Sequence, residues 1–391
     1  MKKLFVFLLS LLVSYHSKAQ EEGITALGPW DHTLESEILQ ESRSIQVYLP
    51  PNYVADTDQE YPVVYLLDGQ QFFHYGVSLS HTFQQFGLTP EFIMVGINTR
   101  YPQRYRHFTS GKEDFMGFLQ QELIPHIEET YRTSGERLLF GWQYAGSLAF
   151  HMLLETPATF NGYFLASPFP IEGQVDALGQ AYSQKTTLCF SVSPGEYNVN
   201  RGTDKLDSVL THQAISGLDW QFLELASEEH HSTGYPTLYH GLRMHFKYYK
   251  EFQEDNLEKF LEAGGLDYAY AYARQRGAQY GLSAELSTWS KYTIIRSAIR
   301  ASDYAHFQAF VNEFVTDEFL VDLGNNAQNI AAFYAEQGEH SEALNIYEVL
   351  LEENPNSERL LNRIGDTYTA MGNTAEAEKY YQRATEASGD E

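Results

Sequence analysis

Cysteine is almost absent from this chain of 391 residues, which contains only Cys189. A single cysteine cannot form an internal disulfide. It lies in the strand-like run 187–190, where a free cysteine usually serves as a small buried apolar residue. We therefore assign Cys189 no catalytic role.

Basic residues are also scarce, with 26 Lys plus Arg against 52 Asp plus Glu and a formal charge of −26. Nucleic acids are bound mainly by clustered Lys and Arg that displace counterions from phosphates. A chain this acidic repels polyanions, so nucleic acid is excluded as the expected partner.

The N-terminal apolar run, residues 4–13, is too short to span a membrane. Lys2 and Lys3 precede it, and the small residues Ser17 and Ala19 follow it, which is the order of a secretory signal peptide. The alternative is a buried N-terminal strand. We expect cleavage after Ala19 and a mature chain in the periplasm or outside the cell, without a lipid anchor because no cysteine follows the run.

What the chain has in quantity is apolar surface: 43% of its residues are hydrophobic, including 28 Tyr, 25 Phe and 4 Trp. This excludes disorder, and the length predicts two packed units. From about residue 34 to 226, β-rich runs alternate with helical patterns, which are clearest at 115–131 and 147–154. The predicted strands are 34–40, 44–49, 61–67, 92–97, 137–140, 163–166, 187–192 and 220–225.

Several later strands are apolar throughout, as strands covered by helices on both faces must be. The first part is therefore predicted to be an α/β domain, a doubly wound sheet of about eight strands that opens with an antiparallel pair. After Tyr249 only helical patterning remains. The expected segments are the signal peptide 1–19, the α/β domain 20–255, linking helices 256–323 that form a degenerate repeat, and a repeat region 324–391.

The final segment repeats itself with an offset of 34 residues. Six pairs keep this spacing: Ile330/Ile364, Ala331/Gly365, Tyr334/Tyr368, Gly338/Gly372, Ala343/Ala377 and Tyr347/Tyr381. The pattern resembles two tetratricopeptide repeats, in which small residues let paired helices cross closely. The alternative is a helical bundle with a chance spacing. Two units bury too little surface alone, so the preceding helices should complete the stack.

The predicted strands and helices of the α/β part have the spacing of an α/β-hydrolase, so the turn after the fifth strand is where a nucleophile is expected. That fold places its nucleophile in a G-x-S-x-G elbow after the fifth strand, and here residues 141–146 read Gly-Trp-Gln-Tyr-Ala-Gly. The nucleophile position is Gln143, and no other G-x-S-x-G occurs in the chain.

Several separate stretches match one family in one order: 47–53, 61–69, 118–128, 166–168, 229–232 and 238–242. On these the chain resembles the "Putative esterase" family of α/β-hydrolases, which includes esterase D and enterochelin esterases, especially exported members with C-terminal tetratricopeptide repeats. The resemblance covers roughly residues 45–246. It implies the chain order nucleophile, acid, histidine.

The family's acid falls on Glu196 and its histidine on His230. In an active member the imidazole would take the nucleophile's proton while the carboxylate held its tautomer. The oxyanion would be held by backbone N–H groups, one from Tyr144 and one near Gly69 or Gln70.

A glutamine at the nucleophile position cannot form an acyl-enzyme. Loss of a triad nucleophile costs about 10⁶ in turnover. Ser147 and Ser167 are substitute candidates, although neither occupies the elbow, and Gln143 could instead bond His230 or orient a water. The chain also departs from the family at Trp142 and Ala145, where His and Gly are usual, and at His107 and Phe169.

Three arginines, Arg100, Arg104 and Arg106, crowd the loop after the fourth strand. They are candidates for binding an anionic group, as Ser167 is; the alternative is a solvated loop paired with surface carboxylates. The histidines show no ligand pairing at helical spacing, so neither a metal nor another cofactor is predicted.

Three functions remain open. The chain could be a catalytically degenerate esterase-like protein that binds a small ester or anionic ligand, an active carboxylic ester hydrolase with an atypical site, or a repeat protein for which the α/β domain is only a scaffold.

Residues 324–391 hold 13 acidic and 4 basic residues, so a protein or peptide partner docking there should be basic or salt-sensitive.

Overall fold

The computed structural model describes residues 31–53, 58–179 and 181–388. The predicted signal peptide and its cleavage site lie outside these residues. The chain divides into two units, one that runs to His245 without residues 87–89 and one made of those three residues and the chain from Phe246 onward. Each has its own hydrophobic core.

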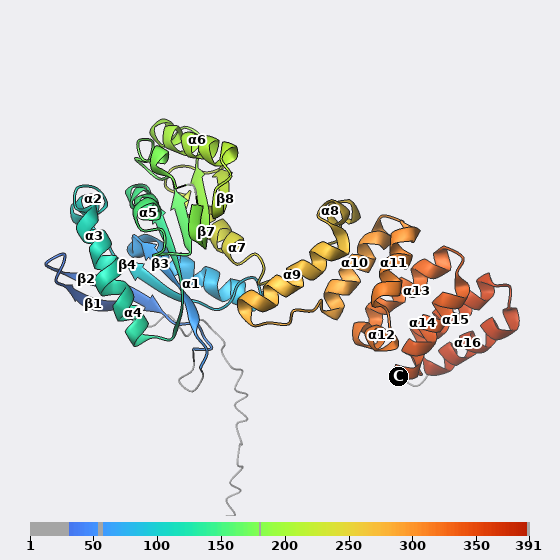
Figure 1. Cartoon of the computed structure of the whole chain (residues 1–391). Helices are drawn as coiled ribbons and strands as arrows, with labels where there is room; N and C mark the ends of the chain where they lie inside the picture. Colours follow the sequence, from blue (N-terminus) through green and yellow to red (C-terminus); the bar gives the residue numbers. More distant parts are fainter. Residues whose placement is uncertain (1–30, 54–57, 180, 389–391) are drawn as a thin grey trace, which may run out of the picture. The chain divides into compact units, whose positions relative to one another are not determined.

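The first unit is built on one eight-stranded sheet in the order β1-β2-β4-β3-β5-β6-β7-β8 (Figure 1). The pairs β1–β2 and β2–β4 are antiparallel and the other pairs are parallel. This confirms the predicted doubly wound sheet and its antiparallel opening. The strands are β1 Asp31–Ser36, β2 Glu41–Tyr48, β3 Tyr61–Leu67, β4 Ile93–Ile97, β5 Thr133–Trp142, β6 Gly162–Ala166, β7 Ala181–Val192 and β8 Ser216–Glu224.

Helices cover both faces of the sheet, as the apolar strands require. On one face, α1 and α7 contact each other and the strands beneath them. On the other face, α3, α4, α5 and α6 contribute buried residues to the hydrophobic core of this unit (Figure 1). The helices of this unit are α1 Gly69–Gln85, α2 Gln103–Phe108, α3 Lys112–Phe118, α4 Ile124–Thr130, α5 Tyr144–Glu155, α6 Tyr197–His212 and α7 Gly234–His245.

Most predicted elements differ from the observed ones by a few residues at their ends, and strands β5 and β7 begin well before the predicted residues, at Thr133 and Ala181. Two of the differences share a cause. The predicted strand 34–40 ends at Ser36, because residues 37–40 form a turn whose N–H groups at Glu37 and Ile38 bond the Glu122 carboxylate at 2.8 and 3.0 Å. The predicted single helix 115–131 is interrupted by a π-helical turn, Leu119–Leu123, which carries Glu122. The contact of Glu122 with the backbone of Glu37 and Ile38 therefore accompanies both differences.

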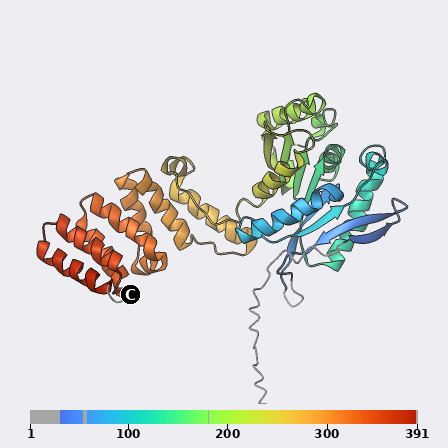
Figure 2. The ribbon, with the colours of Figure 1, turned by 180° about the vertical axis from the view of Figure 1, so that it is seen from behind.

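The second unit is all helical, as predicted (Figure 2). Gly365 faces Tyr381 so closely that a Cβ there would lie 2.5 Å from the ring, and Ala343 and Ala377 are buried. These small residues lie where the repeat pattern requires close helix crossing. The helices are α8 Leu257–Glu262, α9 Gly265–Tyr280, α10 Thr288–Arg300, α11 Tyr304–Phe314, α12 Asp317–Leu323, α13 Ala327–Glu336, α14 His340–Glu353, α15 Glu358–Ala370 and α16 Thr374–Ala387. Among the described residues, 3₁₀ turns occur at Val175–Ala177 in the first unit and at Gly324–Asn326 in the second.

Among the described residues, no helix combines the length and apolar character needed to cross a membrane.

Cys189 is buried in β7, and burial raises the pKa of its thiol to about 12. The thiol is therefore protonated at neutral pH and unreactive.

Candidate functional site

The turn between β5 and α5 keeps the geometry of a nucleophile elbow. Gln143 has φ 59° and ψ −117°, a conformation that L side chains rarely adopt. The turn closes tightly because Gly141 and Gly146 flank it: a Cβ on Gly141 would lie 2.4 Å from the carbonyl oxygen of Ala145. Gln143 therefore stands where the fold normally presents its nucleophile.

Glu196 and His230 meet at the same edge of the sheet, Glu196 after β7 and His230 after β8. The Nδ1 atom of His230 is hydrogen-bonded to Oε1 of Glu196, which leaves Nε2 as the other ring nitrogen. The imidazole side chain is 28% exposed and the carboxylate 7% exposed. Burial raises the pKa of Glu196, but hydrogen bonds from His230, Ser193 and Ser167 outweigh it and lower that pKa to about 2.

Hydroxyl groups behind the pair hold the carboxylate. Oε2 of Glu196 accepts from Ser193 N and Oγ, both at 2.7 Å, and from Ser167 Oγ at 2.9 Å. Ser167 is fully buried and also bonds the hydroxyl of Thr233 at 2.8 Å. The buried Ser167 hydroxyl thus bonds Glu196 and Thr233 and is not exposed as a nucleophile or ligand-binding group would be.

The side chain of Gln143 is bonded by Arg104, which the sequence singled out, and Arg104 is paired with Asp68, which it did not. Asp68 is fully buried and accepts two hydrogen bonds of 2.8 Å from Arg104, one to each carboxylate oxygen. Arg104 also donates to the amide oxygen of Gln143 at 3.3 Å. Thr99 donates its hydroxyl to Asp68 as well. Arg104 is therefore an anchored part of the elbow's surroundings and not a solvated loop residue.

Trp142 lies between His230 and Arg104. Its indole N–H donates to the backbone carbonyl of His230 at 2.9 Å, and its ring centroid is 4.9 Å from the imidazole. The Arg104 guanidinium lies 5.5 Å from the same indole. The tryptophan at the family's usual histidine position thus contacts both the histidine and the arginine.

Backbone donors for an oxyanion lie at the starts of two helices. Tyr144 is the first residue of α5, and Gly69 and Gln70 begin α1, so their N–H groups have no acceptor within their own helices. Strands β3 and β5 are parallel neighbours, which places both helix starts at one edge of the sheet. The side chain of Gln70 accepts from the Thr99 N–H at 2.9 Å.

The remaining predicted residues lie elsewhere. Ser147 is buried on α5 and donates to the carbonyl of Pro170 at 2.6 Å, so its hydroxyl is held away from His230. Arg106 is 59% exposed and lies 3.8 Å from Glu41. Arg100 is exposed. Of the three loop arginines, only Arg104 contacts the elbow.

Together these residues can accept a proton at His230 and bind an oxyanion at the helix starts, but they present no nucleophile. Sequence reasoning missed Asp68, Thr99 and the supporting hydroxyls of Ser193 and Thr233. The available signal was Asp68 itself, a carboxylate that directly follows the apolar strand β3. No group of metal-ligating side chains occurs among the residues with described positions.

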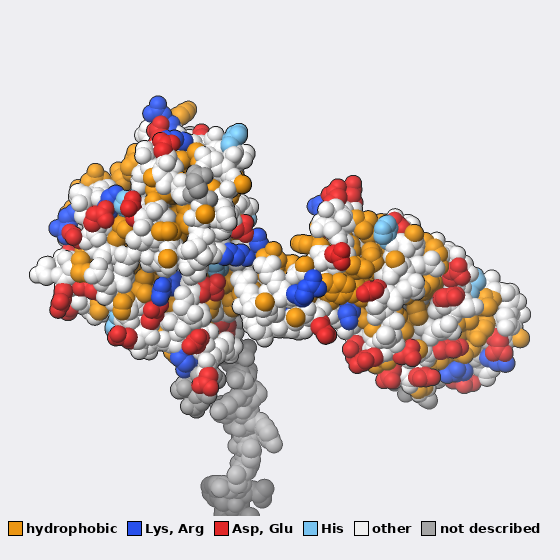
Figure 3. Space-filling view, in the orientation of Figure 1, with side chains coloured by type: hydrophobic (Ala, Val, Ile, Leu, Met, Phe, Trp, Pro, Cys, Tyr) orange, Lys and Arg blue, Asp and Glu red, His pale blue; other side chains and the backbone are white. Residues whose placement is uncertain are grey.

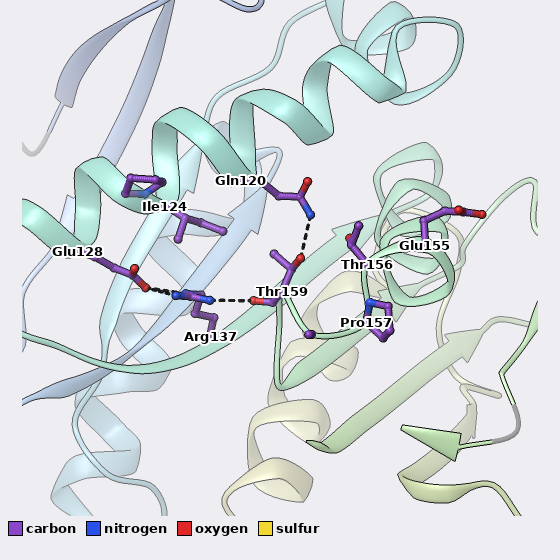
Figure 4. Close-up of a pocket in the computed structure, with 10 residues that line it drawn as sticks. Gln120, Ile124, Glu128, Arg137, Glu155, Thr156, Pro157 and Thr159 are labelled. Carbon is purple, nitrogen blue, oxygen red and sulfur yellow. Dashed lines mark hydrogen bonds and ion pairs between the residues drawn. The ribbon is translucent and has the colours of Figure 1, made fainter. Parts of the chain in front are cut away.

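A separate cavity of about 590 Å³ lies at the opposite edge of the sheet, beside the ends of α4 and α5 (Figure 4). Within it Arg137 donates to Glu128 at 2.6 Å, and Gln120 donates to Thr159 at 2.8 Å. None of the predicted site residues lines it. It is therefore distinct from the elbow.

Two family models match separate parts of the chain. Residues 36–197 match the family described as "Putative esterase", and residues 334–391 match a tetratricopeptide repeat. The first match includes the elbow and Glu196. The chain therefore carries an esterase-like hydrolase domain followed by a tetratricopeptide repeat region, which confirms the resemblance drawn from the sequence.

Two curated relatives each match a different part of the chain. The ferri-bacillibactin esterase BesA of Bacillus subtilis (strain 168) is 25% identical over 160 residues, which are 33% of this chain and 54% of that protein. The photosystem I assembly protein Ycf3 of Synechococcus sp. (strain CC9311) is 35% identical over 83 residues, which are 21% of this chain and 48% of that protein. The chain thus spans about half the length of the curated relatives it matches.

Two solved structures share the fold. An uncharacterised protein from Capnocytophaga ochracea DSM 7271 aligns with a TM-score of 0.57 at 17% identity, covering 87% of this chain and 99% of that one. An IroE-like serine hydrolase from Shewanella oneidensis aligns with a TM-score of 0.50 at 23% identity, covering 72% and 97%. At these identities the likeness concerns the fold alone.

Proposed function

We propose that the esterase-like domain binds a small ester or carboxylate without forming an acyl-enzyme. The observation that carries this proposal is Gln143: it occupies the elbow, and its amide bonds Arg104. An amide is not nucleophilic, and histidine cannot activate it. The retained Glu196–His230 pair and the backbone donors still suit the carbonyl group of an ester.

The ligand class follows from the same groups. Helix starts and a guanidinium favour a carbonyl or carboxylate oxygen, because their partial or full positive charge complements it. The name of the related ferri-bacillibactin esterase suggests siderophore esters as one group to test. Acyl-sugar esters are a second group within the carboxylic esters.

Hydrolysis and covalent labelling test the proposal directly. Wild-type protein and Gln143→Ala should neither release p-nitrophenol from p-nitrophenyl acetate or butyrate above the buffer rate nor react with a fluorophosphonate. Gln143→Ser should gain both, and Gln143→Ser/His230→Ala should lose the turnover again. Robust wild-type hydrolysis that disappears in His230→Ala would overturn the proposal.

The second candidate is an active carboxylic ester hydrolase, favoured by the intact Glu196–His230 pair. In that case Nε2 of His230 would deprotonate a water, with no covalent intermediate. Such an enzyme would turn over esters slowly and remain unlabelled by fluorophosphonate. The two candidates are therefore separated by wild-type turnover and its dependence on His230.

For the repeats we propose a basic protein or peptide partner. Asp and Glu side chains outnumber Lys and Arg on the visible face of the helical unit (Figure 3), and residues 324–391 carry 13 acidic against 4 basic residues. Repeat stacks bind extended segments along their surfaces. Binding of a Lys- and Arg-containing peptide should weaken steeply between low and physiological salt, whereas salt-independent binding would contradict this charge argument.

The finer division into linking helices 256–323 and repeats 324–391 stays a proposal.

We further propose that the chain is exported, on the evidence of residues 1–19. Mass spectrometry of the protein recovered from the periplasm or medium should then find Gln20 as its first residue. Recovery of the chain in the cytosol with Met1 retained would show that the run is not a signal.

A further inference from the structure

The sheet of the first unit ends at β8, an edge strand with apolar side chains (Figure 1). Among the described strands only β7 pairs with it, and no described helix packs against β8 as closely as α6 and α7 pack against β7. Leu218, Trp220 and Phe222 lie against the core of this unit, yet each stays partly exposed. An edge strand of this kind is a template for pairing with another chain.

The open hydrogen-bonding groups of β8 belong to alternate residues. The N–H of Leu225, just past the end of the strand, donates to the carbonyl of Val192 on β7 at 2.9 Å. In a parallel pair the backbone groups of alternate residues point to the same neighbour, so the odd-numbered residues of β8 face β7. Trp220 and Phe222 therefore direct their N–H and C=O groups to the edge. Leu218 adds its carbonyl, because its N–H bonds a carbonyl in the preceding turn.

The segment 218–222 is self-complementary about its central residue. In an antiparallel pair with a second copy, a two-fold axis at Trp220 places Leu218 opposite the second copy's Phe222. The N–H and C=O groups of Trp220 then bond those of its own counterpart, and the N–H of Phe222 reaches the second copy's Leu218 carbonyl. One register thus joins the open backbone groups and aligns the apolar side chains on one face.

Charge favours the same register. On the other face of β8, Asp219 would lie beside the second copy's Gln221, so no like charges meet. Moving the axis by one residue would set Asp219 against its own counterpart or Leu218 against the second copy's Glu224. Like charges directly opposite each other destabilise a strand pair, and a carboxylate gains nothing from an apolar neighbour. The axis at Trp220 is therefore the favoured one.

The opposite edge of the sheet is built differently. β1 has Leu34 as its one apolar side chain, and it carries two carboxylates, Asp31 and Glu35. Charged side chains are how edge strands are normally protected from pairing. β8 lacks this protection over residues 220–223, which contain no charge.

We propose that the esterase-like domain forms a two-fold dimer by antiparallel pairing of β8 with β8 of a second copy, about an axis at Trp220. The two sheets would then form one continuous sheet, through an interface that uses the same patch on both copies. The chain's charge of −26 makes the copies repel at long range, so the dimer is reversible and needs physiological or higher salt. The proposal uses no residue of the elbow and does not depend on the proposed function.

Sedimentation velocity of the full-length protein at physiological salt tests the dimer. The dimer fraction should rise between about 5 and about 200 μM protein. Gln221 offers the sharpest variants, because its side chain is exposed and would lie beside the second copy's Asp219. Gln221→Glu should weaken dimerisation about tenfold by opposing like charges, and Gln221→Lys should strengthen it about as much. Gln85→Glu and Gln85→Lys make the same charge changes at the exposed end of α1 and should leave dimerisation unchanged.

A cross-link tests the register. Trp220→Cys would bring two thiols together at the axis, where paired Cα atoms lie about 5.5 Å apart and suit a disulfide. Leu223→Cys is the control, because that residue would face the second copy's Gly217 and lie far from its own counterpart. Oxidation with copper phenanthroline should cross-link the first variant and not the second. The native Cys189 is buried and should not interfere.

Three results would each overturn the proposal. The first is a monomer at every concentration. The second is a dimer that responds equally to Gln221→Glu and Gln221→Lys, or to neither, since the contact would then lie on another surface. The third is cross-linking of Leu223→Cys in preference to Trp220→Cys. Circular dichroism checks the fold of each variant, and the Gln221 variants decide the question if Trp220→Cys does not fold.

Discussion

At the residue scale, Gln143 is held in a strained backbone conformation although it cannot perform the reaction for which that conformation is used. Such a conformation costs on the order of 1–3 kcal/mol and persists only when the surroundings enforce it. Here the enforcing contacts are the close approach of Gly141 to Ala145 and the bond from Arg104 to the Gln143 amide. Packing and hydrogen bonding therefore hold the elbow in this conformation.

The buried pair Asp68–Arg104 should be essential for stability. Asp68→Asn removes the charge but keeps the size, leaving the Arg104 guanidinium, whose side chain is 17% exposed, without its counterion. We expect a loss of about 3 kcal/mol in the free energy of unfolding, measured with urea at pH 7. Asp176→Asn is the control, because its pair with Lys205 is solvent-exposed and should cost less than about 1 kcal/mol. Equal effects of the two substitutions would contradict the importance of the buried pair.

Glu196 should make stability depend on acid pH. Its folded-state pKa of about 2 lies below the ordinary value of 4.5, so the unfolded state takes up the proton first as the pH falls. The stabilisation from this carboxylate is complete above pH 4.5 and is lost between about pH 4.5 and 2, with a size on the order of 3 kcal/mol.

Urea unfolding of wild type and Glu196→Gln from pH 7 to pH 2.5 would measure this contribution. The difference between them should be largest near neutrality and shrink over the acid range. Glu155→Gln, at an exposed helix end, should show no such pH dependence. A constant difference between Glu196→Gln and wild type at all pH values would refute the assignment.

At the scale of elements, the strands and repeat helices could be predicted because their periodicity is local. β3 begins and ends at the predicted residues, 61 and 67, since its apolar run is bounded by polar or turn residues. The π-helical turn at Leu119–Leu123 could not be predicted, because it places Glu122 against a turn 84 to 86 residues earlier in the chain. The residues next to Glu122 in the sequence give no indication of this distant contact.

The crossing of α15 and α16 gives a test of the repeat geometry. Gly365→Ala would place a methyl group 2.5 Å from the ring of Tyr381, and overpacking of this kind costs about 1–3 kcal/mol. Gly117→Ala is the control in another helix, α3, where the nearest atoms lie at 3.6 Å. That change should be neutral or stabilising by about 0.5–1 kcal/mol. Chemical unfolding followed by circular dichroism would compare them, and a harmless Gly365→Ala would argue against the close crossing.

At the scale of the whole molecule, two separate cores predict two unfolding events. Phe307 is fully buried in the second core, with ring centroids 4.7 Å from Phe333 and 4.9 Å from Tyr334. Phe307→Ala should destabilise the helical unit by about 3–5 kcal/mol. The fluorescence of Trp142, in the first unit, should report an unchanged transition if the other three Trp are replaced by Phe in both proteins. A shift of both transitions together would show that the units unfold as one.

By itself, the sequence determined the sheet of about eight strands, the 34-residue repeat and the glutamine at the elbow position, because each of these depends on neighbouring residues or a fixed spacing. Only the tertiary structure decided which side chains meet. Arg104 lies 36 residues after Asp68, and Gln143 lies 39 residues after Arg104. No local sequence pattern links these three residues. The uncovered edge of β8 is likewise decided by the folded structure, since the order of the strands in the sheet depends on contacts between distant parts of the chain.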